Sequence, residues 1–163
     1  MASQDSKTFE LCDLNATADF AERLANQIPI PFTITLNGTL GAGKTQFVRF
    51  FAQQLGVPAE DVTSPTYVLL QRYVGRQKIY HFDFYRLDSS DQVWDLGIDE
   101  IFVEPAIVIV EWASKFPECL PEDYLELLLT TADGDSKGHR TLVATARGRT
   151  ASETLLHLSN TST

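Results

Sequence analysis

The chain has 163 residues, 44% of them hydrophobic and 21% charged, which is the size and composition of one globular domain with its own core. Its 13 basic and 22 acidic residues give a formal net charge of -9. Because nucleic acid is bound through dense Lys and Arg, this balance argues against tight direct binding to DNA or RNA. A role connected with RNA would run through a protein partner.

The N-terminal residues lack the basic-then-apolar pattern of a signal peptide, and no apolar run approaches the roughly 20 residues of a membrane helix. Cys12 and Cys119 match no metal or redox spacing, which favours free thiols in a reducing compartment. We therefore expect a cytoplasmic protein. Its flexible segment would cover 1–8, a single domain 9–147 and a polar tail 148–163, in which a short helix could form before a frayed end.

Apolar residues recur four apart in two segments of the N-terminal half, and this spacing predicts two helices. The first covers residues 16–27 and stops before two prolines, and the second begins near Lys44 and stops at Gly56. Between them, residues 32–36 have the apolar character of a short strand that leads directly into a glycine-rich run.

The second half of the chain alternates short apolar runs with turn residues, which is typical of strands. Residues 67–85 predict a hairpin around a Gly-Arg-Gln turn. Residues 106–110 are apolar at every position, which suits a central strand buried on both faces. The remaining expectations are a helix or turn over 89–97, strands over 124–129 and 141–146, and a turn over 133–138.

A phosphate-binding motif lies between the first expected strand and the second helix. Residues 38–45 read Gly-Thr-Leu-Gly-Ala-Gly-Lys-Thr and match G-x-x-x-x-G-K-[ST] without departure. The glycines let backbone N–H groups point at phosphate oxygens, and the following helix offers its positive N-terminal end. Lys44 would reach the β- and γ-phosphates, and Thr45 would give its hydroxyl to Mg²⁺. The motif predicts an ATP and Mg²⁺ site contacted by Leu40, Gly41, Ala42, Gly43, Lys44 and Thr45.

Two carboxylates follow apolar strands and are candidates for the metal and the attacking water. Glu111 ends the fully apolar strand, and ligands bind at the carboxyl ends of strands in open α/β sheets, so we assign Glu111 to Mg²⁺. Asp83 is assigned to orienting the water or closing the second metal shell, with structural pairing to Arg86 or His81 as the alternative. His81 could titrate near neutral pH, but a histidine hydrogen-bonded in place is the preferred interpretation.

The segment over residues 63–67 lies between the P-loop helix and the hairpin. In switch-type NTPases a loop in this position supplies a Thr hydroxyl to Mg²⁺ and senses the γ-phosphate, so Thr66 is the first candidate and Ser64 the second. An ordinary turn built around Pro65 is an equally weighted alternative. Trp112 is expected near the nucleotide, on a partner-facing patch or, as the commonest fate of such a residue, buried.

Five motifs together resemble one family. They are the run at 38–45, Ser-Pro-Thr-Tyr at 64–67, His-Phe-Asp-Phe-Tyr-Arg-Leu at 81–87, Leu-Gly-Ile at 96–98 and Val-Glu-Trp at 110–112. In this order they resemble TsaE (also called YjeE), the bacterial ATPase family of tRNA threonylcarbamoyladenosine synthesis. The resemblance covers roughly residues 9–130, and its second and third motifs are far more specific than the P-loop. The family often has a second Thr where Gln46 stands here, a position that should not touch the metal.

The resemblance implies an α/β fold, a P-loop NTPase domain with a mixed, largely parallel central sheet flanked by helices. It implies binding of ATP and Mg²⁺ and slow ATP hydrolysis by the chain alone. Thr45 and Glu111 would hold Mg²⁺, Asp83 would be important for hydrolysis, and Thr66 would lie on the switch-like loop. With the motif, this assigns catalysis to Lys44, Asp83 and Thr66. The partners would be TsaB and TsaD, which with TsaC install the threonylcarbamoyl group at adenosine 37 of tRNAs reading ANN codons.

Three other functions are compatible with a P-loop. A small-molecule or nucleotide kinase would carry an arginine-rich lid, and none is evident. A guanine-specific switch would carry Asn-Lys-x-Asp, which is absent. A non-hydrolysing ATP-gated binding module would lack a group that activates water. The sequence does not place the adenine pocket. Arg140 and Lys137 are candidate contacts, but the favoured interpretation is that both are solvent-exposed charges on a turn.

Overall fold

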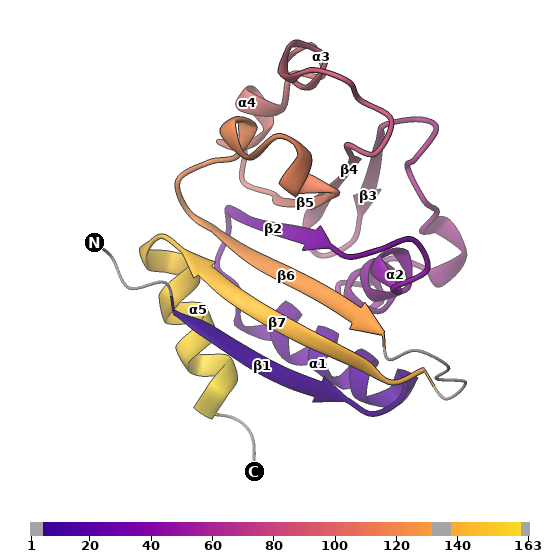
Figure 1. The fold of residues 1–163 in the computed structure, drawn as a ribbon, viewed down its shortest axis with the longest axis vertical. Coiled ribbons are helices and arrows are strands. Elements are labelled where there is room, and N and C mark those ends of the chain that lie inside the picture. Colours follow the sequence, from indigo (N-terminus) through magenta and orange to yellow (C-terminus); the bar gives the residue numbers. More distant parts are fainter. Residues whose placement is uncertain (1–4, 132–137, 161–163) are drawn as a thin grey trace.

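Residues 5–131 and 138–160 are described in the computed structural model of the chain. They form a seven-stranded sheet in the order β1-β7-β6-β2-β5-β4-β3 (Figure 1). Strands β6, β2, β5 and β4 run parallel to one another, β1 runs in the same direction, and β7 and β3 run against their neighbours, so the expected mixed, largely parallel sheet is confirmed. The strands are β1 Ser6–Leu11, β2 Phe32–Asn37, β3 Leu70–Val74, β4 Lys78–Asp83, β5 Ile107–Glu111, β6 Tyr124–Thr131 and β7 Arg140–Arg147.

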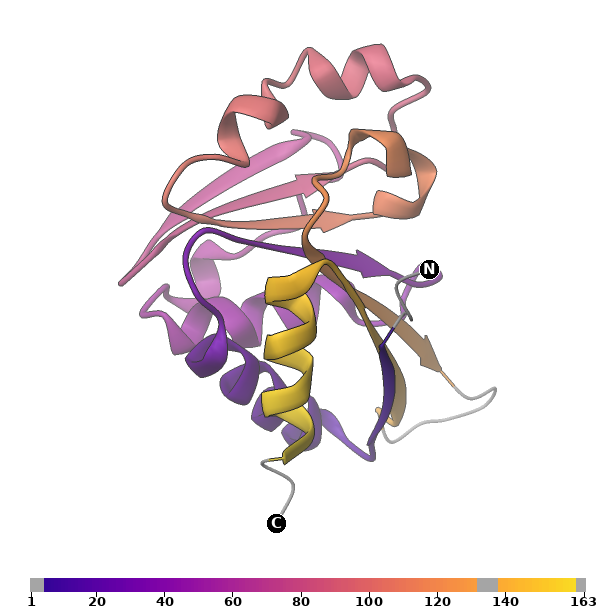
Figure 2. The ribbon, with the colours of Figure 1, turned by 90° about the vertical axis from the view of Figure 1, so that its left-hand side faces the viewer.

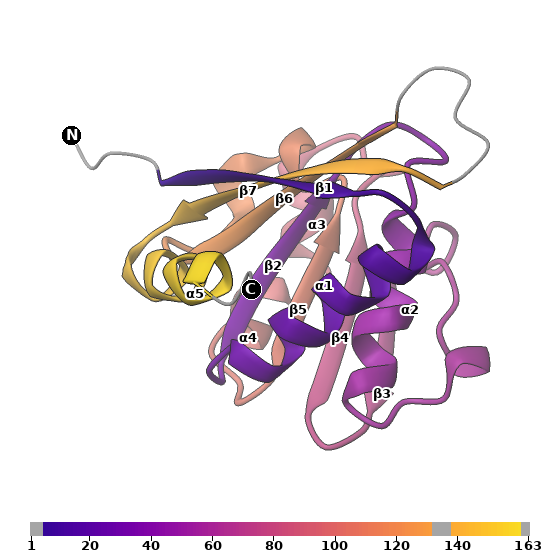
Figure 3. The same cartoon turned by 90° about the horizontal axis from the view of Figure 1, so that it is seen from below.

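Helices cover both faces of the sheet, as Figures 2 and 3 show from two sides. Helices α1, α2 and α5 lie on one face, and the shorter α3 and α4 lie on the other with two 3₁₀ turns. Within the described ranges, none of the helices combines the length and apolar character needed to cross a bilayer. The helices are α1 Leu14–Gln27, α2 Lys44–Gln54, α3 Ser90–Trp94, α4 Ile98–Ile101 and α5 Arg149–Asn160, and the 3₁₀ turns are Ala59–Asp61, Ala113–Lys115 and Pro117–Cys119.

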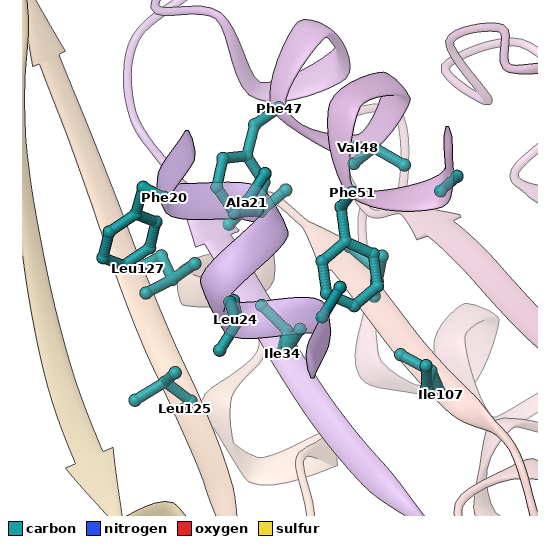
Figure 4. Close-up of a cluster of buried hydrophobic side chains, with 14 of the residues drawn as sticks. Phe20, Ala21, Leu24, Ile34, Phe47, Val48, Phe51, Ile107, Leu125 and Leu127 are labelled. Atoms are coloured by element: carbon teal, nitrogen blue, oxygen red, sulfur yellow. The ribbon is translucent and has the colours of Figure 1, made fainter. Parts of the chain in front are cut away.

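Helices α1 and α2 pack side by side on the sheet and enclose the larger core (Figure 4). Strand β5 is buried along its whole length, with Ile107 and Ile109 in this core and Val108 and Val110 in a second core under α3 and α4. This alternation confirms the expected central strand covered on both faces. The side chains that meet in the larger core include Phe20, Ala21 and Leu24 of α1, Phe47, Val48 and Phe51 of α2, and Ile34, Leu125 and Leu127 of the sheet.

Most expected elements are present, with ends shifted by local hydrogen bonds. Helix α1 begins earlier than expected because the Asp13 side chain accepts a backbone N–H of the first turn at 2.8 Å. Strand β3 begins only at Leu70, because Leu69 adopts a left-handed φ of 69° and its N–H donates to the Pro65 carbonyl at 2.6 Å, which closes a turn. The expected turn over 133–138 lies almost wholly outside the described residues.

Both ends of the described chain contain regular structure: a strand begins within the segment expected to be flexible, 1–8, and the polar tail 148–163 contains the short helix that was expected as one form of it. Residues Ser6–Leu11 form the edge strand β1, paired with β7, although their side chains are mostly exposed. The sheet edge supplies backbone hydrogen bonds whatever the side chains are, so composition underestimates such a strand. Helix α5 buries Leu155 and Leu158 and contacts β6 and β7. The outermost residues of both segments lie outside the described ranges.

Candidate nucleotide site

Three parallel strands end at one edge of the sheet and bring the predicted site residues together. The register pairs Leu36 of β2 with Glu111 of β5, and Glu111 with Asp83 of β4. The chain leaves β2 and turns through residues 38–45, the P-loop, into α2. A cavity of about 240 Å³ opens there, and every predicted site residue except Ala42 lines it.

Two glycines give the P-loop a shape that other residues would not take. Gly43 has a φ of 100° and stands directly before α2, in the left-handed region that favours glycine. A Cβ added to Gly38 would lie 2.5 Å from the carbonyl oxygen of Leu129 in β6, which is closer than real contacts allow. The strand before the loop and the helix after it supply the context that the motif requires. The free N–H groups of the first turn of α2 are thereby available to an anion.

Ala42 lies behind the loop rather than on the cavity. It is 1% exposed, and its carbonyl accepts a hydrogen bond of 2.8 Å from Nε of Arg140, the first residue of β7. Arg140 therefore holds the P-loop from outside, a contact that its sequence position did not predict. Lys137, the other residue weighed as an adenine contact, lies outside the described residues.

Lys44 is nearly buried and is held by the P-loop itself. Its Nζ donates to the carbonyls of Gly38 and Thr39 at 2.7 and 2.9 Å and lies 4.4 Å from the centre of the Trp112 ring. Burial lowers the pKa of the Lys44 ammonium, and the two carboxylates of the site act in the opposite sense. The ammonium thus stands where phosphate oxygens can replace the two carbonyls. Trp112 lines the same cavity beside Lys44, and its expected place near a nucleotide stays a prediction.

Thr45 and Glu111 place two oxygens side by side. The Thr45 hydroxyl donates to Oε1 of Glu111 at 3.1 Å, and Glu111 is 3% exposed. Mg²⁺ prefers oxygen ligands, and in P-loop proteins few of them come from the protein, the rest being phosphate and water. Among the described residues, no group of three or more His, Cys, Asp and Glu side chains could hold a metal ion. The Thr45 hydroxyl and the Glu111 carboxylate, which both line the cavity, are the oxygen atoms that could hold Mg²⁺ here.

The loop over residues 63–69 is tied to Asp83. Thr66 Oγ1 donates to Oδ2 of Asp83 at 2.7 Å, and the hydroxyls of Ser64 and Thr66 lie 2.8 Å apart. The other carboxylate oxygen of Asp83 accepts the Tyr85 N–H at 2.8 Å. Burial raises the pKa of Asp83, although the hydrogen bonds from Tyr85 and Thr66 lower it. Both loop candidates therefore line the cavity, and Thr66 contacts the carboxylate assigned to the water while Ser64 contacts Thr66.

The pairing weighed between Asp83 and Arg86 does not occur among the described contacts. The Arg86 guanidinium instead lies 4.6 Å from the centre of the Tyr67 ring, on the exposed side of the loop. Asp83 and His81 both belong to β4, where their separation by two residues directs them to the same face of the sheet.

Two buried residues extend the site beyond the predicted set. Nε2 of His81 lies 2.9 Å from Oε1 of Glu111, and Nδ1 of His81 lies 3.1 Å from the hydroxyl of Tyr73. That hydroxyl donates to the carbonyl of Thr63 at 3.1 Å, and burial raises the pKa of Tyr73 to about 12. His81 is thus hydrogen-bonded in place, as favoured from the sequence, but its partner is the predicted metal ligand. The sequence pointed to a hydrogen-bonded His81 and gave no signal for Tyr73.

A larger cavity, of about 440 Å³, lies near the start of β2, away from the P-loop. Its charged lining residues are Glu122 and Asp123, and no Lys or Arg of the described chain contributes to its lining. Because two carboxylates repel phosphate, the smaller cavity at the P-loop is the one that suits a nucleotide.

The chain is similar to characterised proteins along most of its length. Residues 11–141 match the family described as threonylcarbamoyl adenosine biosynthesis protein TsaE. A Bacillus subtilis protein, tRNA threonylcarbamoyladenosine biosynthesis protein TsaE, is 40% identical over 64% of this chain and 65% of its own length. The protein of the same name from Nostoc is 34% identical over 82% of this chain and 83% of its own length.

The fold is similar as well. A crystal structure of YdiB from Bacillus subtilis matches with a TM-score of 0.79 and 28% sequence identity, and the match covers 98% of both chains. The structural match therefore includes most of the C-terminal third, where the sequence resemblance is loose. Together, the family match over residues 11–141, the relatives and the shared P-loop fold show that this chain belongs to the TsaE family of tRNA threonylcarbamoyladenosine biosynthesis proteins.

Proposed function

We propose that the chain is a Mg²⁺-dependent ATPase that supports threonylcarbamoylation of tRNA adenosine 37 by acting on a complex of TsaB and TsaD. The observation that carries the ATPase part is the meeting of Lys44, the Thr45–Glu111 pair and Asp83 around one cavity. A phosphate cradle, oxygens for Mg²⁺ and a buried carboxylate are the parts that phosphoryl transfer to water requires. The tRNA part rests on membership of the family.

Lys44 and the first turn of α2 bind the phosphates. When the phosphates enter the cavity, the Lys44 ammonium exchanges the carbonyls of Gly38 and Thr39 for β- and γ-phosphate oxygens. The N–H groups at the start of α2 bind the same anion. Thr45 and Glu111 would hold Mg²⁺, and the bound ion would supply positive charge against the negative charge that develops on the phosphates.

Asp83 orients the attacking water and takes up its proton. Its Oδ1 is fixed by the Tyr85 N–H, and its Oδ2 faces the hydroxyl of Thr66. A raised pKa makes a carboxylate a better proton acceptor than an ordinary aspartate. Thr66, which lines the same cavity, senses the γ-phosphate through the loop.

The positions of the arginines favour hydrolysis over phosphoryl transfer to a second substrate. A kinase clamps the transferring group with several arginines. Arg72 lies 5.4 Å from the centre of the Tyr80 ring, and Arg86 lies over Tyr67. No arginine of the described residues lines the cavity. An assay of phosphoryl transfer to a set of acceptor molecules would distinguish a kinase from an ATPase. The carboxylate of Asp83 beside the cavity argues against the other alternative, an ATP-gated binding module that does not hydrolyse ATP.

Calorimetry with ATP and Mg²⁺ on the wild type and on Lys44→Ala tests the phosphate cradle. We expect the variant to bind ATP about 10- to 100-fold more weakly, because it loses a charge-assisted hydrogen bond to phosphate. Arg149→Ala, in α5, is the control that removes an exposed positive charge far from the cavity. Equal affinity of Lys44→Ala and wild type, or a wild type that binds no ATP, would contradict the proposal.

A further inference from the structure

A buried series of hydrogen bonds joins the loop that begins at Thr63 to the predicted metal ligand. The Tyr73 hydroxyl donates to the Thr63 carbonyl at 3.1 Å and lies 3.1 Å from Nδ1 of His81. Nε2 of His81 lies 2.9 Å from Oε1 of Glu111, the oxygen that also accepts the Thr45 hydroxyl. We refer to the two middle residues as the Tyr73–His81 link.

The Tyr73–His81 link is closed to solvent. The exposed fractions are 4% for Tyr73, 0% for His81 and 3% for Glu111. Alternation along the strands explains this, because β4 and β5 direct His81 and Glu111 to the face that α2 covers. Water does not compete for these groups, so each depends on the next for its hydrogen bond. Loss of one leaves a buried polar group without a partner.

The loop end of the link is the Tyr73 hydroxyl. The Thr63 carbonyl can only accept a hydrogen bond, and it accepts the hydroxyl hydrogen of Tyr73. Nδ1 of His81 lies 3.1 Å from the same hydroxyl, and this contact orients the ring and its Nε2 against Glu111. A displacement of Thr63 would therefore free the hydroxyl hydrogen of Tyr73 and change the contact between this hydroxyl and Nδ1 of His81.

The same loop reaches the neighbouring carboxylate by a second route. Thr66 donates directly to Asp83, which is the register partner of Glu111. Just before the loop, Nη2 of Arg49 in α2 donates to the Val62 carbonyl at 3.2 Å, which fixes the point where the loop departs. The loop thus contacts one carboxylate of the site directly and the other through the Tyr73–His81 link.

We propose that Tyr73 and His81 are positioning residues that couple the conformation of the loop over 63–69 to the Mg²⁺ site at Glu111. This inference rests on the proposed ATPase function and deepens it. When the Thr63 carbonyl contacts the Tyr73 hydroxyl, Glu111 is oriented to bind Mg²⁺. Binding of Mg²⁺ at Glu111 would in turn stabilise this contact between the loop and Tyr73. The coupling is reciprocal, as linkage between two equilibria requires.

Tyr73→Phe tests the metal end of the link, with Tyr80→Phe as a matched control. Tyr80 lies in the same hairpin but faces the second core, where its hydroxyl donates to Glu104 at 2.7 Å. Calorimetry measures the affinity for ATP in the presence of Mg²⁺ and in the presence of EDTA. The ratio of the two affinities is the factor by which Mg²⁺ strengthens ATP binding. We expect Tyr73→Phe to reduce this ratio about tenfold and to leave the affinity in EDTA unchanged. Tyr80→Phe should change neither.

Hydrogen exchange tests the loop end. In the wild type, adding Mg²⁺ to the ATP complex should slow exchange of the amides of Ser64 and of residues 66–69. In Tyr73→Phe this response to Mg²⁺ should be lost, while ATP still protects the P-loop. If the Tyr73 hydroxyl served only in packing, the variant would change the exchange rate of the loop amides without Mg²⁺ but not the slowing of exchange that Mg²⁺ causes.

Either an unchanged affinity ratio or an unchanged exchange response in Tyr73→Phe overturns the coupling. A wild type that binds no ATP, or gains nothing from Mg²⁺, defeats the proposed function instead, so the two failures are distinguishable. If Tyr73→Phe does not fold, His81→Gln replaces it, because the glutamine amide can donate to Glu111 without also bonding Tyr73. His81→Gln should keep most of the metal gain and lose the loop response, and a full loop response overturns the coupling.

Discussion

Asp83 is a carboxylate that the fold buries next to Glu111, at the paired ends of β4 and β5. Burial raises its pKa and outweighs the hydrogen bonds that lower it. The folded protein therefore holds this proton more tightly than the unfolded chain does. Stability from the group is fully present below the usual aspartate pKa and is lost as the pH rises through the raised value.

We therefore expect Asp83→Asn to be more stable than the wild type at neutral pH, with a difference that shrinks towards acid pH. The amide keeps an oxygen for the Tyr85 N–H. The same variant should lose hydrolysis and keep ATP binding, because an amide does not take a proton from water. Urea unfolding between about pH 4 and pH 8 and phosphate-release assays measure the two effects. A stability difference that is constant with pH, or unchanged turnover, would remove Asp83 from this role.

Residues with a local signal could be assigned from the sequence, and residues whose role arises from pairing could not. Lys44 and Thr45 are defined by spacing within one loop, and Glu111 by its place after a fully apolar strand. The contact between Tyr73 and His81 depends on the register of β3 against β4, which no local pattern fixes. The contact of Arg140 with the P-loop likewise needs the order of strands in the sheet.

Among the elements, helix α5 is anchored by a residue outside it. The Asp123 carboxylate accepts the N–H groups of Thr150 and Ala151 at 2.8 and 2.9 Å. Gly148 has a φ of 92°, and a Cβ there would lie 2.7 Å from Cγ of Asp123. Asp123 therefore satisfies two free N–H groups of the first turn and complements the positive end of the helix.

Asp123→Ala is expected to destabilise the fold by about 1 kcal/mol, within the range of roughly 0.5–2 kcal/mol for lost helix caps. ATP binding should not change, because Asp123 precedes β6 at the edge of the sheet opposite the P-loop. Denaturant unfolding and calorimetry measure the two, with the exposed neighbour Glu122→Ala as the control. An unchanged unfolding midpoint, or weakened ATP binding, would show that α5 is held in another way.

Helices and strands with a periodic pattern of apolar residues could be predicted from the sequence. Those held mainly by pairing or packing with other segments could not. Helices α1 and α2 and strand β5 carry patterns that the folded core uses directly. Strand β1 exposes most of its side chains and is held mainly by backbone pairing with β7. Helix α5 buries only a narrow stripe, so its sequence is typical of a polar tail. The β1 strand was therefore missed, and α5 was expected only as a short helix within the tail.

The whole molecule is acidic, with a net charge of -9 and a pI near 4.7. We expect the chain alone to bind tRNA weakly and with little dependence on salt, because few phosphate counterions would be released. With TsaB and TsaD present, the chain should co-purify in an ATP-dependent manner and tRNA should be retained. Filter binding at several salt concentrations and co-purification with and without ATP measure these outcomes. No association in either state would contradict the partner assignment and leave the ATP site unaffected.

Arg140 ties the C-terminal hairpin to the P-loop through its hydrogen bond to the Ala42 carbonyl. It begins β7, where the register places it opposite Thr131 of β6. A slip of β7 by one residue would turn Arg140 to the other face of the sheet and release that carbonyl. Insertions or deletions between β6 and β7 should therefore be tolerated when they keep Arg140 opposite Thr131. A change of length that shifts this register would weaken the P-loop, although the two segments lie far apart in the sequence.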